Sequence, residues 1–153
     1  STTFIRRQKQ PRNKDASQGE KLIKEINIKT NAQVEMIDIT SAVLSAVKEH
    51  KIQSGYCIVF TPHTTAAVTI NENADPDVPR DIITALEKTV VQNAPYRHRE
   101  GNSPAHVKSS LVGASELVLV EGGRLVLGTW QSVFFFEFDG PRSRRVIIKT
   151  ISA

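Results

Sequence analysis

The sequence predicts one mixed domain of β-strands and α-helices, and three observations support this prediction. Its 153 residues suffice to build a single hydrophobic core without disulfides. Apolar residues alternate with a period of two in several short segments and recur at helical spacing in others. In the last third of the chain, glycine- and proline-containing turns separate strand-like segments with no helix between them. We therefore expect an α+β fold that is rich in strands towards its C-terminus.

The first predicted elements follow a polar and basic segment. Residues 1–19 carry little apolar periodicity, so we expect a basic, flexible N-terminal extension there and a single domain over 20–153. Residues 22–29 alternate in hydrophobicity and predict a strand. Residues 34–40 predict a second strand after a turn at Asn31, and the short connection indicates a hairpin.

Apolar residues at helical spacing predict three helices. The first is expected to be capped by Thr40 or Ser41, because a side-chain oxygen there can accept a backbone N–H of the first turn. The second follows the proline-rich turn at 75–79. The third spans 105–111 and ends at Gly113, a residue type that favours helix termination.

The remaining segments predict strands, and those of the last third are expected to pair in sequence order as a meander. The expected strands are 56–60, 65–71, 116–120, 124–128, 131–138 and 144–151. The strand at 131–138 carries four phenylalanines, which place aromatic bulk on both of its faces. It is therefore predicted to be a central strand covered on both sides, or one buried at a subunit contact.

Charge and composition narrow the expected partners. The formal net charge is +4, and much of the positive excess lies at the N-terminus and near residues 142–145. A solvated basic arm accounts for this, and no zinc-finger, RRM or KH pattern is present, so we do not expect nucleic acid as the partner. No apolar run approaches the roughly 18 residues of a membrane span, and no secretory signal opens the chain. These features indicate a cytoplasmic protein whose one cysteine, Cys57, is a small core residue.

Three histidines in polar surroundings are the strongest functional signal in the sequence. They are His63, His98 and His106. Neutral imidazole is the commonest metal ligand in proteins, and three such ligands leave positions open for water or substrate, so one hypothesis is a shared metal site. The alternative is a set of hydrogen-bonded histidines with structural or acid–base roles, because neither HExxH nor a cysteine–histidine pattern is present.

A glutamate within the aromatic strand needs a partner. The period of two places Gln131 and Glu137 on the same face of the strand at 131–138. Burying an unpaired carboxylate in so apolar a segment is costly, so Glu137 is expected to meet a metal, another cation or an arginine. The candidate arginines are Arg142, Arg144 and Arg145.

Two other polar clusters lie at the ends of predicted elements. Asn71, Glu72 and Asn73 directly follow a strand, where binding sites are often built, although the residues alone favour an Asx-rich turn that satisfies local backbone groups. Lys108 and Ser109 lie close to a helix start and could bind a phosphate through an ammonium, a hydroxyl and amide donors. The glycines of a P-loop are missing there.

These same segments resemble the YjbQ-like family, an uncharacterised protein family often labelled secondary thiamine-phosphate synthase. The most specific pieces are His63–Asn73 (HTTAAVTINEN), Ala105–Gly113 (AHVKSSLVG) and Leu127–Gln131 (LGTWQ), within a match from about Glu20 to Ile151. The resemblance implies an α+β fold dominated by an antiparallel β-sandwich, assembled as a homotrimer with polar pockets near subunit boundaries. It also implies a divalent metal ion, zinc in view of the imidazole ligands, at His63, His98 and His106.

The family label implies a reaction that joins a pyrimidine carrying a pyrophosphate leaving group to a thiazole phosphate. In this reading the metal, Lys108 and an arginine neutralise the departing pyrophosphate, and His106 is also catalytic. Trp130 stacks on the heterocycle and Gln131 or Asn73 orients its edge. The expected substrate-binding set is Asn71, Asn73, Ser109, Trp130, Gln131, Glu137 and Arg144.

Two other functions fit the same residues. A metal-dependent hydrolase of a phosphorylated small molecule would use the histidines to activate water, with Glu72 or Asp81 as base. A trimeric module that binds a metabolite or a metal without turnover would need no nucleophile–base pair, and the sequence contains no recognisable one.

Overall fold

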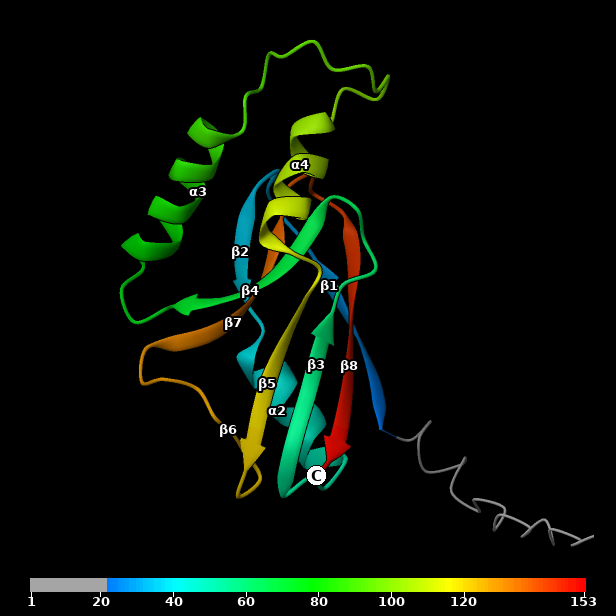
Figure 1. Ribbon diagram of the computed structural model, residues 1–153, viewed down its shortest axis with the longest axis vertical. Helices are drawn as coiled ribbons and strands as arrows, with labels where there is room; N and C mark the ends of the chain where they lie inside the picture. Colours follow the sequence, from blue (N-terminus) through cyan, green and yellow to red (C-terminus); the bar gives the residue numbers. More distant parts are fainter. Residues whose placement is uncertain (1–21) are drawn as a thin grey trace, which may run out of the picture.

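The computed structural model describes residues 22–153, which form eight β-strands and three α-helices (Figure 1). The predicted extension at 1–19 lies outside the described residues. In chain order the elements are β1 (Ile23–Lys29), β2 (Glu35–Asp38), α2 (Thr40–Glu49), β3 (Ser54–Phe60), β4 (Ala66–Glu72), α3 (Asp77–Thr89), α4 (Ser103–Val112), β5 (Ser115–Glu121), β6 (Arg124–Leu125), β7 (Gln131–Glu137) and β8 (Ser143–Ser152).

The strands form two antiparallel sheets. One has the order β1-β8-β3-β5-β6, and the other has the order β2-β7-β4. The mixed α+β class with antiparallel sheets is thus confirmed. The prediction for the aromatic strand is also confirmed, because β7 is the central strand of the smaller sheet and Phe134, Phe135 and Phe136 are all buried.

Two predictions of strand pairing are wrong. The expected N-terminal hairpin does not form, because β1 pairs with β8 and β2 pairs with β7. The expected C-terminal meander is limited to β5 and β6, since β7 belongs to the other sheet and β8 lies between β1 and β3. The alternation of apolar residues identifies a strand and its buried face, but it does not identify the partner strand.

The helix boundaries depart slightly from prediction. The first helix has Ile39 at its N-cap, so neither Thr40 nor Ser41 caps it. Thr40 Oγ1 instead accepts the N–H of Val133 at 2.9 Å and donates to Asp38 Oδ1 at 2.6 Å, which ties α2 to β7. The third helix begins two residues earlier than expected, at Ser103, and ends before Gly113 as expected.

The hydrophobic core lies between the two sheets and α2. It contains inward-facing valines of β3, β5 and β8 together with Val68 of β4, Phe135 of β7, and Val43 and Val47 of α2. Cys57 is fully buried in this core, and burial raises the pKa of its thiol to about 11, in keeping with its predicted structural role.

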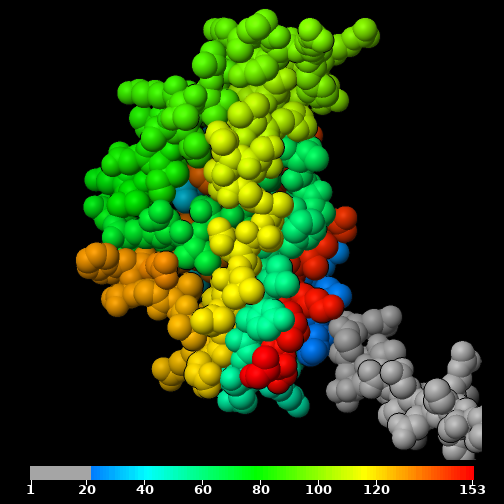
Figure 2. Space-filling view, viewed as in Figure 1, coloured from blue at the N-terminus to red at the C-terminus, as the bar shows by residue number. Residues whose placement is uncertain are grey.

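A second apolar cluster covers the other face of the smaller sheet. Phe136 and Phe138 pack there with Ala105 of α4, against partly buried residues of α3 such as Ile83. None of the three helices in residues 22–153 covers the outer face of the larger sheet, and Figure 2 shows β3 and β5 at the surface on that side. None of the helices in residues 22–153 is long and apolar enough to cross a membrane.

Three connections meet at one end of the molecule, the upper end in Figure 1. They are the loop between β3 and β4, the segment that leads into α4, and the turn between β7 and β8. Hydrogen bonds join them, because the N–H of Phe138 donates to Thr65 O at 3.2 Å and Asn102 Nδ2 donates to Asp139 Oδ2 at 2.9 Å. The three predicted histidines, Glu137 and Arg144 lie in these connections or beside them.

Candidate functional site

A buried ion pair between Glu137 and Arg144 forms the base of the site. Glu137 is 0% exposed and Arg144 is 6% exposed. The Nε of Arg144 donates to Glu137 Oε1 at 2.9 Å, and Thr30 Oγ1 donates to the same oxygen at 2.8 Å. Among the partners predicted for Glu137, the structure therefore selects an arginine. The cost of burying both charges is offset by their pairing and by these hydrogen bonds.

The pair fixes the orientation of the Arg144 guanidinium. Its Nη2 donates to Glu137 Oε2 and also to Thr65 Oγ1, the latter at 2.8 Å. Its Nη1 has no acceptor among residues 22–153, and Arg144 lines a surface pocket. The guanidinium is thus held rigidly on two edges, and its Nη1 hydrogens remain available to a ligand.

The pocket above this arginine has a volume of about 350 Å³, within the range typical of small-molecule sites. All three predicted histidines line it, although the first and second are 35 positions apart in the sequence. We call it the histidine pocket. Its lining residues are Pro62, His63, Thr64, Thr65, His98, Glu100, Asn102, His106, Asp139, Arg142 and Arg144.

The three histidines have different surroundings. His63 Nε2 accepts the backbone N–H of Arg145 at 2.9 Å. Burial lowers the pKa of His63, and the positive charges of Arg144 and Arg145 lower it further, so the neutral ring is favoured. His98 and His106 lie edge to face, with their ring centroids 5.2 Å apart.

The geometry of His63 does not fit a metal ligand. A neutral imidazole has one lone pair and one N–H, and the lone pair on Nε2 is already engaged by the Arg145 amide. Across residues 22–153, no group of three or more histidine, cysteine, aspartate or glutamate side chains is placed to hold a metal ion. The zinc site stays a prediction.

Elemental analysis of tag-free protein tests that prediction directly. We expect His63→Ala to have the same metal content as the wild type, because the ring offers no free lone pair. His98→Ala and His106→Ala serve as matched comparisons. Near-stoichiometric zinc in the wild type that is lost from all three variants would establish the three-histidine site and contradict this expectation.

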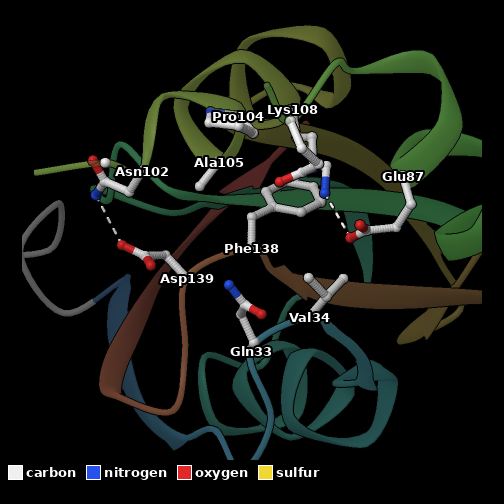
Figure 3. Close-up of a pocket in the computed structure, with 11 residues that line it drawn as sticks. Gln33, Val34, Glu87, Asn102, Pro104, Ala105, Lys108, Phe138 and Asp139 are labelled. Atoms are coloured by element: carbon white, nitrogen blue, oxygen red, sulfur yellow. Dashed lines mark hydrogen bonds and ion pairs between the residues drawn. The ribbon is translucent and has the colours of Figure 1, made fainter. Parts of the chain in front are cut away.

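Lys108 does not enter the histidine pocket. It is 3% exposed, and its Nζ lies 2.7 Å from Glu87 Oε1 of α3 in a separate cavity of about 90 Å³ (Figure 3). His106 and Lys108 are two positions apart on α4, so helical geometry directs them to different sides. Ser109 is also occupied, since its Oγ donates to Ala66 O at 2.7 Å. The proposed phosphate role of Lys108 and Ser109 is therefore not supported at this pocket.

Several predicted ligand-binding residues lie at the opposite end of β7. This Trp130 cluster consists of Asn71, Glu72, Asn73, Trp130 and Gln131. Glu72 is paired with Gln131 across the two strands, and the N–H of Asn73 donates to Trp130 O at 2.9 Å. Gln131 and Glu137 are six positions apart on one strand, which corresponds to roughly 20 Å. Within one chain, the Trp130 cluster therefore lies far from the histidine pocket.

Asn71 and Asp81, two other predicted site residues, do not line the histidine pocket. Asn71 Oδ1 accepts the N–H of Glu72 at 2.7 Å, so this side chain satisfies a local backbone group at the end of β4. Asp81 is exposed on α3 and lines neither the histidine pocket nor the Lys108 cavity. A role for Asp81 as a base beside the histidines is thus not supported, because the helix places it elsewhere.

Some residues of the site were not identified from the sequence. Thr65 orients Arg144, and Asn102 and Asp139 form a hydrogen-bonded wall shared by the pocket and the Lys108 cavity (Figure 3). Glu87 neutralises Lys108 from a helix that looked simply amphipathic. Only long-range contacts give these common residue types their roles, so no local pattern could have indicated them.

Comparison with known proteins gives a consistent result. A family model described as "UPF0047 protein YjbQ-like" matches residues 24–153. A UPF0047 protein of Methanocaldococcus jannaschii is 49% identical over 86% of this chain and 95% of its own length. The UPF0047 protein YugU of Bacillus subtilis is 51% identical over 84% of this chain and 98% of its own length.

Solved structures agree with the sequence comparison. An uncharacterised conserved protein of the YjbQ/UPF0047 family from Clostridium acetobutylicum superposes with a TM-score of 0.81 at 52% identity, covering 83% of this chain and 98% of its own. A YbjQ-like protein of unknown function from Sulfolobus solfataricus gives a TM-score of 0.82 at 32% identity, covering 86% of this chain and 96% of its own.

Proposed function

The chain belongs to the UPF0047 family of YjbQ-like proteins, and on that premise we propose that its histidine pocket binds a phosphorylated small molecule. The observation that carries the proposal is the Arg144 guanidinium, which a buried carboxylate holds in place while its Nη1 has no acceptor in residues 22–153. Such a donor is preorganised for an oxyanion, since its orientation is fixed before the ligand arrives.

Two arginines line the pocket, and although each is paired with an acid, each keeps an Nη1 group without an acceptor among residues 22–153, which supports an anionic ligand. One of these arginines is Arg142, whose Nη2 lies 2.8 Å from Asp139 Oδ2. The same carboxylate oxygen also accepts a hydrogen bond from Asn102 Nδ2. The pocket also lies at the start of α4, where the helix dipole adds positive potential. Glu100 is the other acid of the lining, and its Oε2 lies 3.8 Å from His98 Nε2.

A thiamine-phosphate synthase reaction would use these groups as follows. The thiazole nitrogen forms a bond to the pyrimidine-bearing carbon as the carbon–oxygen bond to pyrophosphate breaks, and pyrophosphate leaves with the bonding electrons. Arg144, Arg142 and the His63 N–H would stabilise the charge that accumulates on the leaving oxygens. This assignment replaces Lys108, which lies in a separate cavity.

In this proposal the flat heterocycle contacts a neighbouring subunit. Trp130 is 65% exposed, and the residues of 22–153 that line the histidine pocket lie near the other end of β7. A homotrimer in which the Trp130 cluster of one subunit faces the histidine pocket of another would unite the two sets of residues. Stacking on the indole and hydrogen bonds from Gln131 or Asn73 would then orient the ring.

Turnover separates the proposed reaction from simple binding. Incubation with the pyrimidine pyrophosphate and thiazole phosphate should yield thiamine phosphate and pyrophosphate in equal amounts. Saturable protection against heat without product would identify a binding module instead, because a ligand of the native state raises its apparent stability. A protein that shows neither product nor protection with any phosphorylated compound would contradict the proposal.

The open face of the larger sheet supports the proposed trimer. Leu117 and Leu119 of β5 are more than half exposed, and they lie opposite Ile58 and Tyr56 of β3. Together with the exposed Phe60 of the same sheet they form a continuous apolar surface, a feature that in soluble proteins marks an interface.

This surface gives a testable prediction about assembly. Wild-type protein should have a mass in solution of about three times the 16.9 kDa chain. The double variant Leu117→Asp/Leu119→Asp should have the mass of one chain, because a trimer of this variant would have to bury two carboxylates of each subunit at the interface. Light scattering after size exclusion measures this, with Leu111→Asp on the exposed side of α4 as the matched control. A wild-type monomer, or a double variant that keeps the trimer mass, would refute the prediction.

A further inference from the structure

His63 and Arg144 are positioned by the same short stretch of β8. The Arg144 side chain is buried and turns towards Glu137, while the next residue, Arg145, uses its backbone N–H to bind His63 Nε2. The side chains of His63 and Arg144 both line the histidine pocket. The strand therefore fixes a guanidinium and an imidazole beside each other by two independent contacts.

The contact from Arg145 determines which nitrogen of His63 carries the hydrogen. A backbone amide can only donate, so Nε2 must present its lone pair. In the neutral ring the hydrogen is then on Nδ1. Nδ1 has no acceptor among the described residues, so its N–H is available within the pocket. The lowered pKa of His63 agrees with a ring that stays neutral.

We infer that His63 is a donor of fixed tautomer, which together with Arg144 Nη1 recognises the oxygens of a phosphoryl group. This inference rests on the proposed function and adds a specific role, because it assigns to His63 the recognition of an oxyanion in place of a metal. Two donors on separate rigid supports suit a group with several oxygens, and neither can accept a hydrogen bond from a cationic or neutral ligand.

Two amide variants separate the roles of the two ring nitrogens. In His63→Asn the side-chain NH₂ lies near the place of Nδ1, so it can keep the donor and lose the acceptor for Arg145. In His63→Gln the longer side chain reaches the place of Nε2, so it can keep that acceptor and lose the donor. Titration with inorganic phosphate and with pyrophosphate should show affinity within about threefold of wild type for Asn, and about tenfold weaker for Gln.

Nitrogen NMR of the full chain, with labelled histidines, provides a readout that a purely structural role would not change. The His63 ring should show a protonated Nδ1 and an unprotonated Nε2, and the Nδ1 hydrogen should shift when phosphate is added. A protonated Nε2 in a protein that still binds phosphate would overturn this inference alone. So would a Gln variant that binds as tightly as wild type. Wild-type protein that binds neither phosphate nor pyrophosphate would overturn the proposed function as well.

Discussion

Replacement of Arg144 with methionine should destabilise the protein by about 3–5 kcal/mol, the range observed when one partner of a buried ion pair is removed. Glu137 is fully buried, and without Arg144 its charge keeps only the hydroxyl of Thr30 and backbone N–H groups as partners. For a domain of this size, the loss corresponds to a fall in Tm of about 10 °C. Denaturant unfolding and calorimetry both measure it.

Two further variants make this prediction specific. Arg145→Met removes the next arginine, which is exposed and pairs with Glu25 at 3.4 Å, so it should change stability by less than about 1 kcal/mol. The double variant Glu137→Leu/Arg144→Met removes both charges and should recover much of the lost stability. An Arg144→Met protein as stable as Arg145→Met would mean that the buried pair is not the base of the site.

Arg144→Lys should reduce the affinity for pyrophosphate by about 100-fold while leaving the fold intact. Lysine keeps the positive charge beside Glu137, but its single nitrogen cannot contact Glu137, Thr65 and a ligand in the way that the planar guanidinium does. The loss of a charge-assisted hydrogen bond in a fixed geometry accounts for the magnitude. Calorimetric titration near 0.15 M salt measures it and limits nonspecific attraction by other basic residues.

Arg124→Ala is the matched control for this measurement. Arg124 is an exposed arginine that lines a different hollow, between α2 and the β5–β6 hairpin. Its removal should leave pyrophosphate affinity unchanged, whereas a loss equal to that of Arg144→Lys would indicate diffuse electrostatic attraction. Retention of wild-type affinity by Arg144→Lys would show that the guanidinium does not contact the ligand.

The sequence located the strands better than their partners. Alternation in β1 and the aromatic run in β7 identified both strands and predicted that β7 would be covered on both sides. The pairing of β1 with β8 joins segments more than a hundred residues apart, and no local pattern encodes it. The predicted hairpin and meander failed for this reason, since short connections favour local pairing only where the buried faces agree.

The candidate site was predictable in residue type and less so in arrangement. The three histidines, Glu137 and its arginine partner were identified because buried charges and clustered imidazoles need an explanation. The position of Lys108 in a separate cavity was not predicted, because its local sequence gives no sign of Glu87 on a different helix. The separation of Trp130 from the histidines likewise depends on which end of β7 each one occupies. The sequence therefore indicated which residue types form the site, whereas which of them lie close together depended on the fold.

The most direct test of the central claim is a calorimetric titration of tag-free wild-type protein with pyrophosphate. The proposed histidine pocket predicts saturable binding with one site per chain, competed by inorganic phosphate and by phosphorylated heterocycles. Absence of heat and of competition, with the protein folded and at its native assembly state, would contradict the claim that this pocket binds a phosphorylated small molecule.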